Sequence, residues 1–282
     1  MPKDSSKNSI KEIIKDSKTK IKAIKKDSKE QIKAVKKKTL EILSSKDTIY
    51  AKKLELLNQR EKEALIPKRY SIGEEIFNSV SHGIGAGLSI AALVLLILQS
   101  VTHAPQADKV FYVTGFTIFG TTLIVLYLMS TLYHALTPYH VKKVFGVFDH
   151  SSIYLLISGT YTPFCLGVLR QNGGWWLFGI IWGLTVIGIT CYAVFRSKMR
   201  LFSAISYIIM GWLICLFWKT LKANVPIISI QFLLIGGAFY TLGVIFYALK
   251  KIKWTHCIWH LFVLAGSIFH FFSVFLSVGG RT

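Results

Sequence analysis

The sequence predicts an all-α integral membrane protein, a bundle of seven transmembrane helices preceded by a basic, helical cytoplasmic extension. Three observations support this fold class. Hydrophobic residues make up 52% of the 282 positions and charged residues only 17%, fewer than a soluble domain of this length carries. Seven apolar segments are long enough to cross a bilayer, which takes about 20 residues at 1.5 Å each. Residues 1–69 hold 21 of the 34 Lys and Arg residues, so the chain divides into a lysine-rich extension, 1–69, and a membrane domain, 70–282.

The extension carries an eleven-residue repeat. Apolar residues recur at two positions of this repeat: Ile10, Ile21 and Ile32 at one, and Ile13, Ile24 and Val35 at the other. Eleven residues over three turns give about 3.67 residues per turn, so these side chains form one stripe on a helix that is otherwise rich in lysine. The pattern favours a solvated or partly disordered basic helix, with adsorption to anionic lipid headgroups or self-association as alternatives. Nucleic acid is not an expected partner, because no aromatic residues interleave with the lysines.

The seven predicted spans follow one another with short polar connections. They cover residues 76–101, 110–133, 148–169, 175–195, 201–218, 226–249 and 256–278. The connections leave little room for a soluble domain, so the spans are expected to pack as one bundle.

Basic residues in the connections indicate the orientation. If the extension is cytoplasmic, the second, fourth and sixth connections are cytoplasmic as well and carry eight Lys and Arg residues, against five on the other side. The prediction is a multi-pass protein of the cell membrane with its N-terminus inside and its C-terminus outside.

Asp149 is an unusual residue for this membrane domain. After Glu75 the chain has two acidic residues, and whereas Asp108 lies in a polar connection, Asp149 opens an apolar span. A charge inside a span costs about 2.5 kcal/mol or more on insertion scales, so we expect Asp149 to be paired or used. Two histidine-bearing segments, 130–134 and 256–260, are expected on the same side of the membrane.

The spacing in these two segments predicts a metal site. Ser130 and His134 are four residues apart and so share a helix face. His256 and His260 share a face in the same way. Three neutral imidazoles, from His134, His256 and His260, leave the fourth position open, as in catalytic zinc sites. Zinc would lower the pKa of a bound water to about 7. Asp149 would accept that proton or orient a histidine, and Ser130 would hydrogen-bond the developing oxyanion or the aspartate, so the site would hydrolyse an amide or ester.

Other residues near these segments are open to more than one interpretation. The polar residues at the start of the first span either support the metal ligands or cap the helix and pair with loop lysines; they are Glu74, Glu75, Asn78 and His82. The four cysteines lie in apolar segments and are expected to be reduced packing residues, with Cys257 a less favoured metal ligand. Other transition metals also suit three imidazoles.

The residues of these motifs resemble those of the hemolysin III family. The resemblance is carried by residues 74–85, 130–134, 148–163 and 256–260. That family is the bacterial branch of the progestin and adipoQ receptors, within a wider group that includes alkaline ceramidases. The resemblance runs from about residue 70 to the C-terminus and leaves the extension outside.

The resemblance implies a seven-helix protein with zinc held by His134, His256 and His260, and with Ser130 and Asp149 in the accompanying polar positions. In the ceramidase and adiponectin-receptor relatives this site is associated with hydrolysis of lipid amides, which implies membrane lipids and a lipid-like substrate as partners. The bacterial branch is named after a cytolytic, pore-forming activity, and a metal-containing receptor or sensor is a third alternative. A secreted pore former would need an export signal and a polar lumen stripe, which this sequence does not predict. Hydrolysis is therefore the favoured hypothesis.

Overall fold

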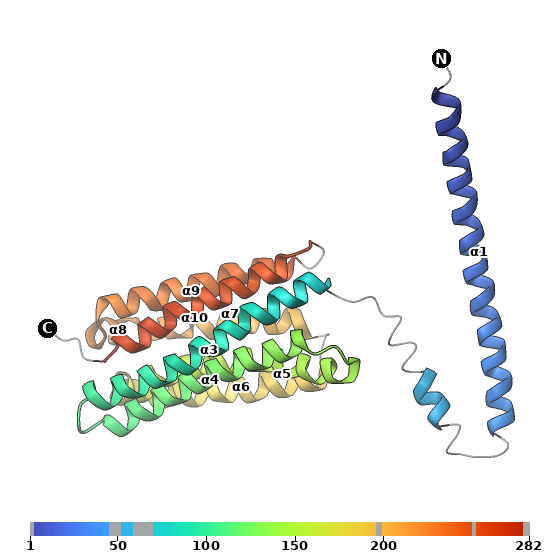
Figure 1. Ribbon diagram of the computed structural model, residues 1–282. Coiled ribbons are helices and arrows are strands. Elements are labelled where there is room, and N and C mark those ends of the chain that lie inside the picture. Colours follow the sequence, from blue (N-terminus) through green and yellow to red (C-terminus); the bar gives the residue numbers. More distant parts are fainter. Residues whose placement is uncertain (1–2, 45–51, 59–69, 196–198, 250–251, 279–282) are drawn as a thin grey trace. The chain divides into compact units, whose positions relative to one another are not determined.

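The computed structural model describes residues 3–44, 52–58, 70–195, 199–249 and 252–278. Secondary structure in these ranges is helical throughout, which confirms the all-α prediction (Figure 1). Contacts divide the chain into two units, the extension (Met1–Pro67) and the membrane unit (Lys68–Thr282), and each is considered by itself.

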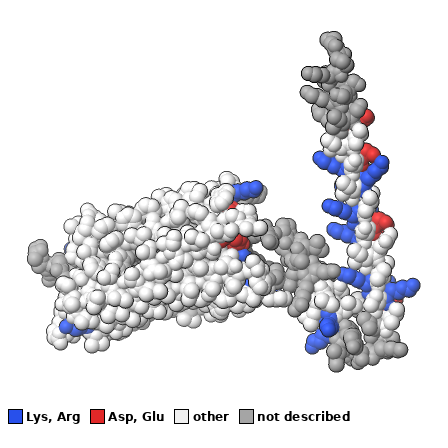
Figure 2. Space-filling model, in the orientation of Figure 1, with Lys and Arg blue, Asp and Glu red and all other residues white. Residues whose placement is uncertain are grey.

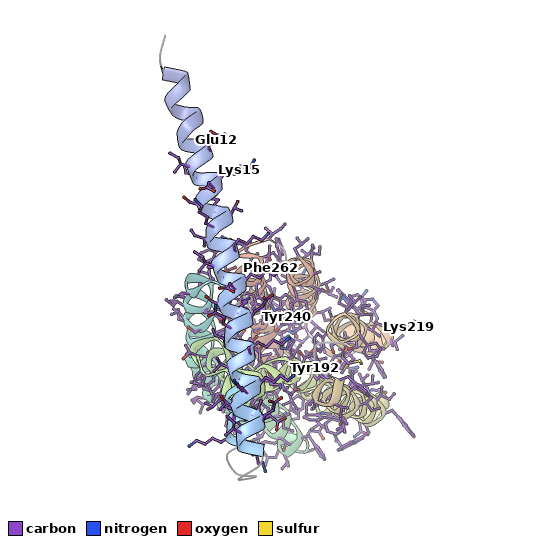
Figure 3. The ribbon with its side chains drawn as sticks, turned by 90° about the vertical axis from the view of Figure 1, so that its right-hand side faces the viewer. Glu12, Lys15, Tyr192, Lys219, Tyr240 and Phe262 are labelled. Carbon is purple, nitrogen blue, oxygen red and sulfur yellow. The ribbon has the colours of Figure 1, made fainter. Side chains whose placement is uncertain are left out.

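The eleven-residue repeat of the extension lies within a single helix, α1 (Lys3–Ser44). Its described side chains are nearly all exposed, and Figure 3 shows them extending outward from the helix, Glu12 and Lys15 among them. A second, short helical segment covers residues 52–58.

The membrane unit is built of long helices that lie side by side (Figure 1). The helices of this unit, in chain order, are α3 (Ile72–His103), α4 (Lys109–Ala135), α5 (Tyr139–Leu166), α6 (Trp175–Phe195), α7 (Arg200–Trp212), the short α8 (Trp218–Asn224), α9 (Ile227–Ala248) and α10 (Thr255–Leu276). A π-helical turn, η1 (Arg170–Gly174), precedes α6, and a 3₁₀ turn, η3 (Leu213–Phe217), joins α7 to α8. Each predicted span thus coincides with a helix or with the segment from α7 to α8.

Six helical segments in the described part of the chain are long and apolar enough to cross a membrane. They are α3, α4, Arg170–Phe195, Leu201–Asn224, α9 and α10. On the face seen in Figure 2, Lys, Arg, Asp and Glu gather at the ends of the membrane unit and leave its flank uncharged. This confirms a multi-pass membrane protein. The count of seven crossings stays a prediction, because α5 is not among the six segments. The orientation in the membrane also stays a prediction.

Helix α5 is less apolar because other helices enclose it. It packs against α4, α6, α7 and α10. Serine and threonine side chains along it are buried, and three of their hydroxyls donate to carbonyls one turn earlier: Ser152 to Asp149 (2.7 Å), Thr160 to Leu156 (2.8 Å) and Thr162 to Ser158 (2.7 Å). A helix shielded from lipid can carry such residues, because their hydroxyls find partners inside the protein.

Two boundaries differ from the sequence prediction. Helix α5 begins at Tyr139 rather than near residue 148, so most of the expected polar connection before it is helical. The fifth segment continues through η3 to Asn224 instead of ending near residue 218. Its change of helix type occurs beside α5, where the Tyr161 hydroxyl donates to the Met210 carbonyl (2.6 Å) and accepts from the Ile214 N–H (2.8 Å). A partner from another helix thus satisfies backbone groups at the break, which sequence periodicity does not reveal.

The arrangement of the helices brings one end of α3, α4 and α10 together. Helix α3 packs against α4 along its length, and α10 packs against both α3 and α9. The first turns of α3 and α10 therefore lie near the last turn of α4, which carries His134.

Candidate metal centre

Three of the predicted ligands come together in the membrane unit. His134 lies in the last turn of α4, and His256 and His260 lie in the first two turns of α10. Their ligand atoms all lie within 4.8 Å of one another, and these three form the group with metal-binding geometry among the described residues. His134 and His260 are buried, and His256 is half-buried. The predicted convergence of these histidines is confirmed, and the group could hold a metal ion.

The geometry of the pair on α10 fits a shared cation. The Nε2 atoms of His256 and His260 are 3.1 Å apart. Such a contact is a hydrogen bond when one Nε2 carries a proton, and when neither does, a cation between the two nitrogens removes the repulsion of their lone pairs. Two nitrogens at about 2.0–2.1 Å from one tetrahedral ion would be about 3.3 Å apart, close to the observed separation.

A carboxylate holds the third histidine. The His134 Nδ1–H donates to Oε2 of Glu75 over 2.6 Å, and Lys142 Nζ donates to Oε1 of the same carboxylate, also over 2.6 Å. His134 Nε2 is buried and has no hydrogen-bond partner in the described structure. A carboxylate on one ring nitrogen fixes the tautomer that presents the other nitrogen to a metal. Glu75 thus supports a ligand, one of the two roles that the sequence left open.

Glu74, next to Glu75, has the other role. Its carboxylate accepts from the backbone N–H of Ser71 (2.8 Å), and the Ser71 hydroxyl accepts from the Glu74 N–H (3.3 Å), which together form a capping box at the start of α3. Its second oxygen accepts from the backbone N–H of Trp254 (2.8 Å), just before α10. Glu74 therefore ties the starts of α3 and α10 together.

His82 lies against the group without being part of it. Its ring stacks on that of His260 with centroids 3.7 Å apart and an interplanar angle of 22°. Its side chain is buried, as is the amide of Asn78 one turn earlier, and neither forms a regular side-chain hydrogen bond in the described structure. These buried polar groups line the side of the centre that faces α3.

Ser130 and Asp149 also lie at the centre. Ser130 is buried on α4, one turn before His134. The carboxylate of Asp149, on α5, lies within electrostatic range of His134 and His82, whereas the buried Ser130 hydroxyl has no hydrogen-bond partner among the described residues. The carboxylate of Asp149 also lies beside His150, whose Nδ1 is 3.3 Å from it. The structure places both residues as the sequence suggested, and their catalytic roles stay predictions.

Two contacts of the centre were missed by sequence reasoning. Lys142 was not singled out as the loop lysine that would pair with these carboxylates, yet it pairs with Glu75. Tyr70, just before α3, stacks on His256 with ring centroids 4.7 Å apart. Neither residue carries a local motif, because each reaches the centre only through the packing of α3 against the ends of α4 and α10. Cys257, the less favoured ligand, points its thiol at the Glu74 carbonyl instead (3.9 Å).

An apolar cavity of about 100 Å³ lies between α5, α7, α9 and α10. Its lining includes Ile153, Leu156, Leu233, Val244 and Val263, and also Trp259, which precedes His260 in the chain. Tyr240 of α9 also contributes to this lining.

The family to which this architecture belongs follows from a comparison with family models. The model described as Haemolysin-III related matches residues 70–271. The chain belongs to the hemolysin III family. The match covers the membrane unit and its centre, and it begins after the lysine-rich extension.

Curated relatives support this membership. Hemolysin-3 of Bacillus cereus is 45% identical over 207 residues, which are 73% of this chain and 93% of that protein. The Hemolysin-3 homolog of Bacillus subtilis (strain 168) is 43% identical over 205 residues, 73% of this chain and 94% of that protein. A more distant relative is the monocyte to macrophage differentiation factor of Homo sapiens, 28% identical over 167 residues, 56% of this chain and 67% of that protein. No solved structure matches this hemolysin III family member.

Proposed function

We propose that this membrane protein is a zinc-dependent hydrolase of a lipid amide or ester, with the ion bound by His134, His256 and His260. The observation that carries the proposal is the convergence of three imidazoles from two helices at largely buried positions. Structural zinc sites are closed by a fourth protein ligand, commonly a thiolate. The described residues around this group supply none, since Cys257 faces the Glu74 carbonyl. A three-histidine set leaves one position open for chemistry.

The surrounding residues have defined tasks in this proposal. A bound zinc ion would supply Lewis acidity and a water acidic enough to react at neutral pH. Glu75, neutralised by Lys142, holds the His134 ring with its Nε2 toward the group. Asp149 accepts a proton at its carboxylate as water attacks, and Ser130 Oγ donates a hydrogen bond to the substrate oxygen on which negative charge develops.

The position of the centre favours a lipid as substrate. It lies at the ends of helices whose flanks face the membrane, and an apolar cavity runs beside α10. Trp259 and Val263 of α10 line that cavity, one residue before and three residues after His260. An acyl chain in the cavity would bring the amide or ester group near the histidines.

Cytolysis is the second candidate function, and the names of the two Bacillus relatives favour it. Hydrolysis as proposed requires the three histidines, whereas a pore could form without them. Leakage from lipid vesicles that is unchanged in a variant without the three histidines would support a pore that is independent of the centre.

The test of the proposed function begins with metal content. Purified protein is assayed by inductively coupled plasma mass spectrometry beside the triple variant His134→Ala, His256→Ala, His260→Ala. A His103→Ala variant serves as the control, because His103 is exposed at the far end of α3 and contacts Thr102. We expect about one zinc per chain in the wild type and the control, none in the folded triple variant, and zinc-dependent release of fatty acid from a lipid-amide panel. A folded wild type that binds no metal after zinc is supplied would refute the hydrolase.

A further inference from the structure

The extension presents an apolar stripe that no described residue covers. Ile13, Ile24 and Val35, at one position of the repeat, expose 65%, 64% and 65% of their surface, and Ile21 and Ile32, at the other, expose 52% and 54%. Five β-branched apolar side chains on one line of a helix are not needed for helix formation, for which alanine or lysine is better suited. The stripe therefore indicates a surface that binds something apolar.

Charge is unevenly distributed around the stripe. With eleven residues to three turns, Lys18 and Lys29 lie on one flank of the stripe, and Asp16 and Asp27 lie at the same angular distance on the other. Lys20, on the acidic flank, pairs with Asp16 over 2.7 Å. Helix α1 thus has an apolar stripe with a lysine flank on one side. The flank on the other side carries acidic residues, and one of them, Asp16, is already paired with a lysine, Lys20. Figure 2 shows the density of lysines along this helix.

We propose that α1 is a membrane-surface helix. Its isoleucine stripe enters the boundary between headgroups and acyl chains, and its lysine flank contacts anionic lipid headgroups of the bilayer that the membrane unit crosses. Long helices with a lysine-rich polar face and a narrow apolar face bind bilayers in this way. The acidic flank then faces water.

Charge and connectivity favour a bilayer over another partner. Helix α1 carries 14 lysines and six acidic residues, so a second copy of the chain would add the same excess of positive charge, whereas anionic lipid neutralises it. The 27 residues between α1 and α3 reach about 90 Å at most when fully extended. This link therefore limits how far the end of α1 can move from the membrane that α3 crosses, and it gives the helix a raised local concentration at that surface.

The test uses the full-length protein, one copy per lipid nanodisc, with hydrogen–deuterium exchange of α1 as the measurement. Discs of phosphatidylcholine alone are compared with discs that also contain phosphatidylglycerol. We expect amide exchange across residues 12–42 to be at least about tenfold slower in the anionic discs, because each lysine at such a surface favours the bound state about fivefold. The difference should disappear at about 1 M salt, where the Debye length falls to about 3 Å.

Matched variants locate the contact surface. Lys18→Gln with Lys29→Gln removes two lysines beside the stripe, and Lys15→Gln with Lys26→Gln removes two at the same spacing opposite it. We expect the first pair to abolish most of the slowing and the second to leave most of it, because headgroup contacts decay within a Debye length of about 8–10 Å. All of these variants lie outside the membrane unit, whose thermal unfolding confirms that the rest of the protein is intact.

Three results would overturn the proposal. The first is equal exchange in neutral and anionic discs. The second is slowing that needs two copies per disc, which would assign the stripe to self-association. The third is slowing that appears only when double-stranded DNA is added, which would assign the lysines to nucleic acid.

Discussion

The chemistry of the centre depends on single residues that hold the histidines in place. His134 would be free to rotate about its side-chain torsions without a partner, and Glu75 removes that freedom through a 2.6 Å hydrogen bond to Nδ1. Lys142 compensates the charge of Glu75, which is only 20% exposed and would otherwise be costly to bury. The Lys142–Glu75–His134 chain therefore sets both the tautomer and the direction of the ring.

Replacement of Glu75 should weaken metal binding without removing a ligand. In Glu75→Gln the carboxylate becomes an amide that accepts more weakly from the His134 Nδ1–H, and Lys142 loses its counter-charge. Removal of such a partner typically lowers metal affinity about 10–100-fold, and we expect that range here. The measurement is zinc dissociation by competition with a chromophoric chelator.

The neighbouring carboxylate provides the control for this prediction. Glu74→Gln changes the same chemical group one position earlier, but Glu74 bonds Ser71 and the Trp254 backbone rather than a histidine. Its variant should change zinc affinity far less than Glu75→Gln and mainly weaken the helix cap, by roughly 0.5–1 kcal/mol. Equal losses of affinity in the two variants would contradict the specific role of Glu75.

At the scale of helices, the position of α5 depends on close approach to its neighbours. A Cβ added at Gly115 of α4 would come within 2.9 Å of the Pro163 Cα of α5, and at Gly188 of α6 a Cβ would come within 2.4 Å of the Tyr154 ring. A Cβ at Gly179 or Gly183, by contrast, would meet nothing within 4 Å. Among these glycines of α6, Gly188 therefore permits a close contact with α5, and Gly179 and Gly183 do not.

Gly115→Ala should therefore destabilise the bundle. The obstructing atom belongs to the backbone of α5, which cannot move aside as a side-chain tip can, and overpacking of this kind typically costs about 1–3 kcal/mol. Thermal unfolding in detergent should give a lower midpoint for Gly115→Ala and an unchanged or slightly higher one for Gly183→Ala, because alanine favours a helix over glycine. A similar midpoint for both variants would mean that α4 and α5 can separate without loss.

Sequence reasoning located the histidines because their signal is local. His256 and His260 share a face through their i, i+4 spacing, and the order of the spans alone places His134 at the same membrane side. The partners of these histidines could not be found in this way. Glu75 and His134 are 59 residues apart and meet through helix packing, and α5 begins at Tyr139, nine residues before the predicted span, in a stretch that includes His140, Lys142 and Lys143. Hydropathy records exposure to lipid, so it underestimates a helix that other helices enclose.

For the molecule as a whole, the number of crossings decides which side each functional part faces. Glu75 at the start of α3, His134 at the end of α4 and His256 at the start of α10 meet at one end of the bundle. The extension is joined to the chain at that same end of α3. If the start of α3 faces the cytoplasm, as predicted, the metal centre lies at the cytoplasmic end of the bundle.

Whether α5 crosses the membrane can be tested by finding on which side of the membrane each terminus lies. Seven crossings put the termini on opposite sides, whereas six would put them on the same side. We expect a fluorescent protein fused to the N-terminus to fluoresce, which requires the cytoplasm, and alkaline phosphatase fused after Thr282 to be active, which requires export.

Two internal fusions flank α5 directly. Phosphatase after Leu136 should be inactive and phosphatase after Arg170 should be active, because basic residues near α5 favour retention of its first end in the cytoplasm. Phosphatase that is inactive at both positions would show that α5 enters the bundle without crossing it. That result would also contradict the packing of α10, which begins at the metal centre and ends beside Gln99, near the far end of α3.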